Sequence, residues 1–256
     1  MIAGLLYQAR IKANGNECQE KTHVFMFPYY SLVRYKVMDI LVGDSFLNRK
    51  ELVEQVTYQV VSYAYETYFK FVYPYEYRLA KDNGLLKGQT DKEKNDYFIE
   101  TLSAKEEWIL YCFEKYPKLN YMLNAYTKGI IAHLKYFANS IETDCHQLKS
   151  YFCIGEFKVK DICIVEGDLH AGRCVSSVTL QNGIKLYYKP RNAANEKFLL
   201  DVNSYLGNMG LRINIGIPLF LDKDTYSWHL HINGKELPCD TTTMGYYYNL
   251  GKLQGL

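Results

Sequence analysis

Apolar side chains recur at helical spacing in the N-terminal part of the chain. In two long segments the apolar positions follow the three-to-four-residue spacing that places side chains on one face of a helix. The two stripes consist of Leu52, Val56, Val60, Val61, Tyr65 and Phe69, and of Leu119, Met122, Leu123, Tyr126, Ile130, Leu134 and Phe137. We therefore expect amphipathic helices that pack through these faces.

Glycine-containing breaks lie between the two stripes. Asn83-Gly84 and Lys87-Gly88 interrupt the pattern, and Thr90-Asp91 with Glu93 is a start signal for a new helix, because threonine and glutamate side chains can satisfy the first backbone N–H groups. The helical pattern continues to about Lys160. No linker rich in Pro, Gly or Ser separates it from the segment that follows.

Beyond Lys160 the pattern changes to that of strands. We expect strands at about Phe157–Glu166, on both sides of Asn182-Gly183, at Leu211–Leu221 and at Tyr226–Ile232, with Asp222-Lys223-Asp224 as a turn and a helix at about Ala194–Leu206. This order predicts an α+β fold, in which a helical platform at residues 1–153 precedes an antiparallel sheet with one packed helix at residues 154–256.

The hairpin around Asn182-Gly183 has a register that the apolar residues decide. A plain two-residue loop would place Val178 and Leu180 on the face opposite Ile184 and Leu186. A shift by one residue, with Gly183 in a left-handed bulge position, instead sets Leu180 opposite Ile184 and Val178 opposite Leu186. We expect this bulged register because it makes one face of the hairpin apolar.

In this register Val175 lies opposite Lys189, beside a turn bounded by glycines. The turn has the sequence Gly167-Asp168-Leu169-His170-Ala171-Gly172-Arg173. Glycines let backbone amides approach a phosphate closely, and a lysine on the neighbouring strand supplies a compact positive charge. The combination indicates a nucleotide site, although similar turns and Lys-Pro strand ends also occur in ordinary hairpins.

Composition excludes several classes of protein. The net charge of +2 does not call for the phosphate contacts of a nucleic-acid-binding protein, so we expect no nucleic-acid partner. Seven Cys at irregular spacing include no Cys-x-x-Cys pair, which disfavours a disulfide framework and a zinc site and suits a reducing cytoplasm. No metal ligands are assigned. No apolar run is long enough to span a bilayer, so no membrane span is expected.

These residues resemble the dehydratase domain of class II lanthipeptide synthetases. Besides the turn and Leu186-Tyr187-Tyr188-Lys189-Pro190-Arg191, the likeness includes Leu86-Lys87-Gly88-Gln89-Thr90, Tyr116-Pro117-Lys118-Leu119, Asp144 with Leu148 and Phe152, Tyr226-Ser227-Trp228, and Tyr246-Tyr247-Tyr248 with Gly251. It extends from about Phe27 to the last residue. Ser227 is a departure, because the family commonly has Gly before this Trp.

The resemblance implies a fold and an activity. Enzymes of this family resemble lipid kinases, phosphorylate Ser and Thr of a precursor peptide with ATP and Mg²⁺, and then eliminate the phosphate. By this likeness the segment 154–256 is a kinase-like N-lobe with the start of the following helix, and the precursor peptide is the partner. Val175 then caps the adenine, and Lys189 holds the ATP phosphates together with Gly172 and Arg173 of the turn.

Individual roles follow partly from chemistry and partly from the resemblance. A carboxylate repels phosphate, so Asp168 is a poor phosphate ligand, whereas elimination needs a base for the α-proton. In the family the Asp-x-His pair that corresponds to Asp168 and His170 is associated with elimination, and which of the two takes the proton is open. Either Glu196 or Glu236 could orient Lys189, and the sequence does not choose between them. Arg191 is a candidate partner for an acid.

The family's Asp-x-His-x-x-Asn catalytic loop and metal-binding Asp have no match in the sequence, so the kinase-like C-lobe is expected to be absent. The chain is therefore interpreted as the N-terminal portion of a dehydratase, acting with the remaining part of the synthetase and incomplete alone. The alternative is a non-catalytic module that binds a leader peptide or a nucleotide. A purely helical interaction protein would leave the hairpin and its turn unexplained.

Overall fold

The helices between Phe27 and Tyr151 precede the strands along the chain, and the helix Ala194–Asn208 lies between the strands Lys185–Lys189 and Phe220–Asp222, as the sequence predicts. The computed structural model describes residues 26–41, 50–103, 105–170, 172–210 and 217–232. The helices are α2 (Phe27–Leu41), α3 (Lys50–Ala64), α4 (Val72–Asp82), α5 (Asp91–Tyr97), α6 (Glu106–Lys115), α7 (Pro117–Tyr151) and α8 (Ala194–Asn208). The strands are β1 (Val159–Cys163), β2 (Ser176–Leu180), β3 (Lys185–Lys189), β4 (Phe220–Asp222) and β5 (Ser227–Leu230). The α+β class is thereby confirmed.

The chain divides into two compact units. The first contains Met1–Glu142 and Ile162–Cys174, and the second contains Thr143–Asp161 and Val175–Leu256. The long helix α7 and the strand β1 each contribute residues to both units. The division into residues 1–153 and 154–256 that the sequence suggests stays a prediction.

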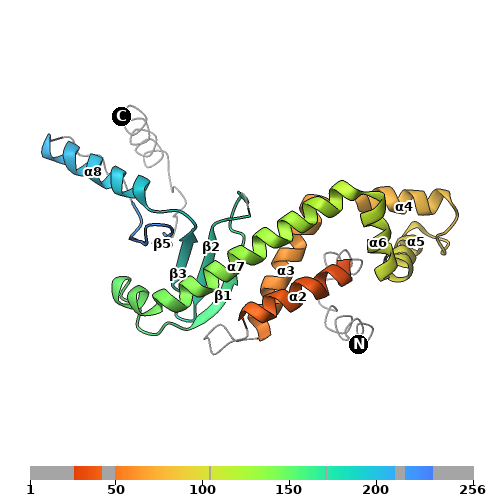
Figure 1. The fold of residues 1–256 in the computed structure, drawn as a ribbon, viewed down its shortest axis with the longest axis horizontal. Helices are drawn as coiled ribbons and strands as arrows, with labels where there is room; N and C mark the ends of the chain where they lie inside the picture. Colours follow the sequence, from red (N-terminus) through yellow and green to blue (C-terminus); the bar gives the residue numbers. More distant parts are fainter. Residues whose placement is uncertain (1–25, 42–49, 104, 171, 211–216, 233–256) are drawn as a thin grey trace. The chain divides into compact units, whose positions relative to one another are not determined.

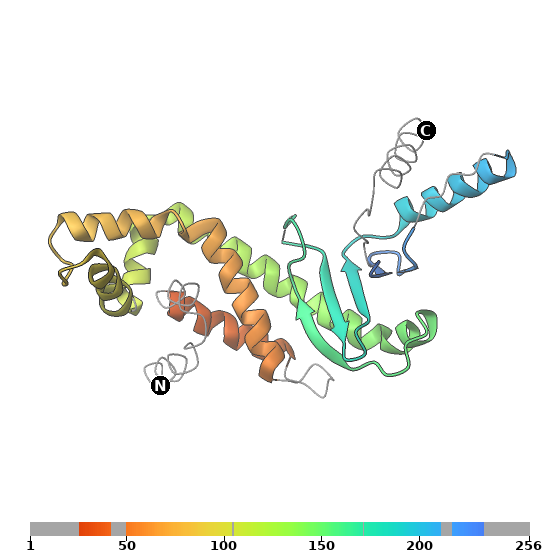
Figure 2. The ribbon, with the colours of Figure 1, turned by 180° about the vertical axis from the view of Figure 1, so that it is seen from behind.

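In the first unit, apolar stripes and a few buried hydroxyl groups join the helices. The Tyr29 hydroxyl on α2 lies 2.8 Å from the Thr127 hydroxyl on α7, and the Tyr126 hydroxyl donates to the Val60 carbonyl on α3 at 3.0 Å. These polar groups are buried but paired, so they add direction to a core held mainly by apolar burial. Figure 2 shows α2, α3 and the N-terminal part of α7 from behind.

The two predicted stripes are mostly buried, with two exceptions. Met122 is 39% exposed, because Leu119, Leu123 and Tyr126 already occupy the buried face and Met122 lies beside it. Tyr65 is only half-buried, since a π-helical turn at Tyr65–Phe69 continues α3 with one extra residue. The wider turn shifts the phase of the helix so that Phe69 returns to the core.

The predicted start of α5 is confirmed. The Thr90 hydroxyl accepts from the Glu93 backbone N–H at 3.2 Å, and the Glu93 carboxylate accepts from the Thr90 N–H at 3.0 Å. This reciprocal pair is a capping box, which satisfies two backbone donors that the helix itself leaves open.

In the second unit, antiparallel pairing builds a sheet with the strand order β1-β2-β3-β5-β4. Strands β2 and β3 form the predicted hairpin, in which Val178 lies opposite Leu186 and the Leu180 N–H donates to the Ile184 carbonyl at 2.8 Å. Gly183 has φ +84°, the left-handed conformation that the bulged register requires. The apolar residues of both strands are buried on one face, so the register prediction is confirmed.

The last strands are shorter than the sequence suggests. Among the described residues 217–221 of the expected strand Leu211–Leu221, Phe220 and Leu221 belong to β4, which ends at Asp222; residues 211–216 lie outside the described residues. Pro218 explains the late start, because proline has no backbone N–H for the ladder. The turn after β4 is confirmed, with Asp224 at φ +63° and the Lys223 N–H donating to the Tyr226 carbonyl.

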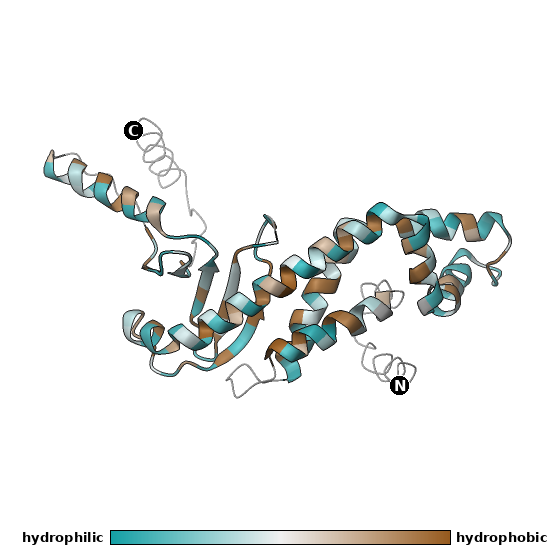
Figure 3. Ribbon diagram, in the orientation of Figure 1, coloured by the Kyte–Doolittle hydropathy of each residue, from teal (hydrophilic) through white to brown (hydrophobic). Residues whose placement is uncertain are grey.

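The helix α8 starts beside the end of β3 and extends away from the sheet (Figure 1). Its first turn is fixed to the sheet by polar contacts, whereas Phe198, Tyr205 and Met209 farther along are each more than 60% exposed. Figure 3 shows hydrophobic and polar residues mixed along α7 and α8. Within the part of the chain that the structure describes, no helix is both long and apolar enough to cross a membrane.

Candidate functional site

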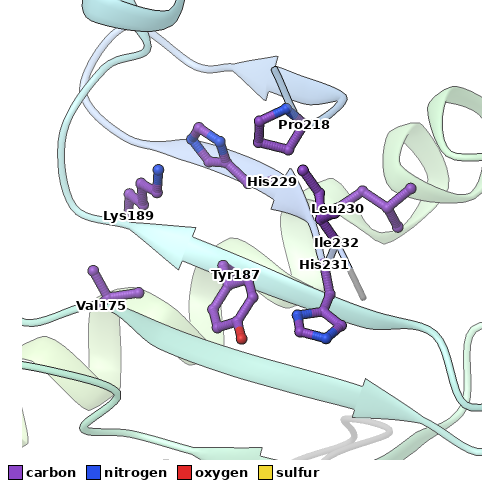
Figure 4. A pocket seen from close by; sticks show the side chains of 8 residues that line it. All are labelled: Val175, Tyr187, Lys189, Pro218, His229, Leu230, His231 and Ile232. Carbon is purple, nitrogen blue, oxygen red and sulfur yellow. The ribbon is translucent and has the colours of Figure 1, made fainter. Parts of the chain in front are cut away.

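A pocket of about 420 Å³ lies on the face of the sheet opposite the buried apolar face of the β2–β3 hairpin. Val175, directly before β2, and Lys189, at the end of β3, both line it, as the register predicts (Figure 4). The remaining lining residues are Tyr187, Pro218, His229, Leu230, His231 and Ile232. Mostly apolar walls with a few polar groups are typical of a small-molecule site.

Lys189 is paired with a carboxylate on the next helix. Its Nζ lies 3.1 Å from Oε1 of Glu196, in the first turn of α8. The sequence left Glu196 and Glu236 as alternatives for this role; Glu196 makes the contact, and Glu236 lies outside the described residues. The pair joins the end of a strand to the start of the following helix.

Arg191 shares the same carboxylate. Its two terminal nitrogens bond the two carboxylate oxygens of Glu196 at 2.9 and 2.8 Å, so the pairing is bidentate. This fulfils the expectation that Arg191 pairs with an acid. The hydrogen bonds from Arg191 and Lys189 hold the pKa of Glu196 at about 2, so this carboxylate is ionised at neutral pH.

A buried serine fixes the backbone of this segment. The Ser227 hydroxyl, inside β5, donates to the Arg191 carbonyl at 2.9 Å and lies 2.9 Å from Nε2 of His229. Because the single hydroxyl proton of Ser227 is donated to the carbonyl, Nε2 of His229 must be protonated and donate to the Ser227 oxygen. The resemblance left the turn at Ser227 open; the residue lies within a strand, and its side chain links β5 to the end of β3.

His229 is neutral in this arrangement. Its ring is 2% exposed, and burial together with the positive charge of Lys189 lowers its pKa to about 4. The ring stacks on Phe220 with centroids 5.8 Å apart. His229 therefore shapes the wall of the pocket without adding charge near neutral pH.

The glycine-bounded turn belongs to the first unit. The backbones of His170 and Arg173 exchange two hydrogen bonds, at 2.8 and 2.9 Å, and Gly172 has φ +78°. A Cβ on Gly129 of α7 would lie 2.7 Å from the Cα of Gly172, so the backbone of the turn is in direct contact with the backbone of the helix. Only glycine at both positions permits this contact.

Asp168, His170 and Arg173 are exposed on this turn. The positive charge of Arg173 also adds to burial in lowering the pKa of His133, on α7, to about 4. The structure thus groups Asp168, His170, Gly172 and Arg173 in the first unit, and Val175 with Lys189 in the second. Their roles in catalysis and cofactor binding stay predictions.

Asp144 joins two of the other sequence landmarks, Tyr226 and Trp228, and pairs with Lys223. Its Oδ2 accepts from Nε1 of Trp228 and from the Tyr226 hydroxyl, both at 2.8 Å, and its Oδ1 lies 2.9 Å from Nζ of Lys223. Sequence reasoning marked Asp144, Tyr226 and Trp228 without a role. Together they attach the β4–β5 hairpin to the C-terminal part of α7.

Sequence reasoning gave two residues of the site no role in it. Ser227 and Asp222 gave no signal beyond a small polar side chain and a turn, yet Asp222 accepts from the Ala193 N–H at 3.0 Å and pairs with Lys197. Asp222 thereby fixes the start of α8 to β4. Within the described residues, no group of three or more His, Cys, Asp and Glu side chains could hold a metal ion.

A family model matches the C-terminal part of the chain. A search of curated proteins finds no similar protein. Residues 116–256 match the family model described as "Domain of unknown function (DUF4135)", a domain found in lanthipeptide synthetase-type proteins. This segment includes all of α7, the turn, the whole sheet and α8. Because the match covers more than half of the sequence, the chain belongs to the DUF4135 domain family.

Proposed function

We propose that this chain carries the nucleotide-binding part of a lanthipeptide dehydratase, which phosphorylates Ser or Thr of a precursor peptide with ATP and then eliminates the phosphate. The observation that carries the proposal is the pair between Lys189 and Glu196, 3.1 Å apart. Protein kinases use the same pair, a lysine on a sheet strand and a glutamate on the following helix, to hold ATP phosphates.

The pocket suits a nucleotide in shape and chemistry. Val175 and Leu230 supply apolar walls for a base, and Lys189 supplies charge in the same pocket (Figure 4). Glu196 uses one of the three ammonium N–H groups of Lys189. The other two have no partner among the residues that the structure describes, so they are available to phosphate oxygens. ATP with Mg²⁺ would supply the phosphoryl group and most of the charge neutralisation.

The elimination step is assigned to the turn of the first unit. The phosphate ester first forms when the peptide hydroxyl oxygen bonds the γ-phosphorus, ADP leaves and the hydroxyl proton is released. Asp168 or His170 then removes the α-proton, a carbon–carbon double bond forms, and phosphate leaves with the electrons of the Cβ–O bond. Both residues are exposed and therefore accessible to a peptide. Arg173, exposed on the same turn, is assigned to hold the departing phosphate as a guanidinium fork.

Calorimetry of ATP and adenosine binding tests the nucleotide site. Lys189→Met removes the ammonium group while keeping the stem, and we expect it to weaken ATP binding about tenfold or more without changing adenosine binding. The matched control is Lys160→Met, a 63% exposed lysine on β1. An unmodified chain that binds ATP no more tightly than adenosine would refute the proposal.

Mass spectrometry of the precursor peptide tests the chemistry in the synthetase that carries this sequence. Phosphorylation raises the peptide mass and completed dehydration lowers it. We expect Lys189→Met to leave the peptide unmodified, and Asp168→Asn or His170→Ala to accumulate phosphopeptide. Nucleotide binding without any transfer would instead indicate a non-catalytic module.

A further inference from the structure

One carboxylate in this site serves two cations. Oε1 of Glu196 accepts from both Lys189, at 3.1 Å, and Arg191, at 2.8 Å, while Oε2 is bonded by Arg191 at 2.9 Å. A lysine and a glutamate alone would form a neutral pair. The arginine makes the group a cluster of two positive charges and one negative charge.

Arg191 is held in this position by its side chain and by its backbone. One terminal nitrogen also donates to the Asn192 carbonyl at 2.9 Å, so both terminal nitrogens are bonded within the protein. The Arg191 carbonyl accepts from Ser227, whose side chain is fully buried. Pro190 fixes the backbone between the two cations. The arrangement is therefore built into the end of β3 and the start of β5.

The charge of the cluster depends on Arg191. Glu196 is ionised and His229 is neutral, so Lys189, Arg191 and Glu196 together carry one net positive charge. Without Arg191, the carboxylate would neutralise Lys189 and repel a phosphate that approaches it. The bidentate arginine thus keeps the ammonium group of Lys189 available to an anion.

We infer that Arg191 is a positioning residue of the phosphate site: it binds and neutralises Glu196 so that Lys189 can bind nucleotide phosphates. The inference rests on the proposed function, because it assigns the ligand of Lys189 to the phosphates of ATP. It assigns Arg191 a role through Glu196 and not through contact with the ligand, since Arg191 does not line the pocket and three of its five N–H groups are bonded to Glu196 and Asn192.

A double substitution tests this role by calorimetry with ATP and adenosine. Arg191→Gln is expected to weaken ATP binding about tenfold, because the local net charge falls to zero, and to leave adenosine binding unchanged. Adding Glu196→Gln to Arg191→Gln removes the repelling carboxylate and restores the net positive charge. The double variant should therefore bind ATP within about threefold of the unmodified chain.

Lys197→Gln is the matched control. It removes one positive charge from the same helix, but Lys197 pairs with Asp222 and is 56% exposed. We expect Lys197→Gln to bind both ligands as the unmodified chain does. A loss of ATP binding as large as that of Arg191→Gln would mean that any nearby positive charge suffices, which overturns the inference.

The other outcomes are equally decisive. A double variant as weak as Arg191→Gln would mean that the arginine contacts the phosphate directly, and loss of adenosine binding in Arg191→Gln would mean that it shapes the pocket. Either result overturns the inference and leaves the proposed function intact. Failure of the unmodified chain to prefer ATP over adenosine would instead refute the proposed function.

Discussion

Replacing Asp144 by Ala should unfold the sheet unit at much lower denaturant concentration, because this carboxylate is 1% exposed and serves three partners. The change removes the carboxylate that accepts from the indole N–H of Trp228, a fully buried side chain. An orphaned buried donor costs about 1–3 kcal/mol, and the lost charged hydrogen bonds bring the expected total to about 3–5 kcal/mol. A domain has only about 5–15 kcal/mol of stability, so this loss is large.

Trp228 itself can report the transition. The sequence has two tryptophans, so a Trp108→Phe background leaves Trp228 as the fluorescent probe of the sheet unit during urea unfolding. Asp144→Asn keeps one acceptor oxygen, so its free energy of unfolding should fall by only about 1–2 kcal/mol.

The control is Asp161→Ala. The Asp161 side chain is 46% exposed and belongs to a surface ion pair, so we expect this variant to lose less than about 1 kcal/mol of unfolding free energy. If Asp144→Ala lost no more than Asp161→Ala, the reasoning about buried acceptors at this site would be refuted.

Three further predictions concern the helical unit. Gly129→Ala would place a methyl group 2.7 Å from Gly172, and urea unfolding followed through its tryptophan should show a loss of about 1–3 kcal/mol. The folded pKa of His133 lies near 4, below the unfolded value of 6.5, so the unfolded state binds more protons and stability falls as the pH drops from 6.5 towards 4. The difference from His133→Gln, measured at pH 7.5 and pH 5, should show this loss, on the order of 2 kcal/mol between those pH values. Burial raises the pKa of the Cys112 thiol to about 12, so iodoacetamide should modify the exposed Cys153 before Cys112, as peptide mapping would reveal.

The hairpin register was predictable because its determinants are local. Alternating apolar residues have only two ways to face the core, and Gly183 permits the bulge that places Val178 and Leu186 on the same face. The capping box at Thr90 was predictable for the same reason, since its two partners are three residues apart. Met122 shows the limit of such patterns, because periodicity marks an apolar face without fixing its edges.

The partners of Lys189 required the structure. Choosing Glu196 depends on how the helix after β3 is rotated relative to the strand, and a residue seven positions away can face the lysine or point elsewhere. The partner of the Ser227 hydroxyl is still harder to predict, because the acceptor is a backbone carbonyl 36 residues earlier. Every residue has such a carbonyl, so the sequence pattern does not single it out.

Ser227 has a structural role that a glycine at this position could not fill. A glycine at this position of β5 would leave the Arg191 carbonyl without its serine donor and Nε2 of His229 without its serine partner. The hydroxyl satisfies both groups inside the strand, next to the end of β3, where Ser227 pairs with Lys189 in the sheet register. Ser227 thus adds a fixed point for the segment that carries Lys189 and Arg191. The positions of Lys189 and Arg191 are therefore fixed by β5, through Ser227, as well as by the start of α8, through Glu196.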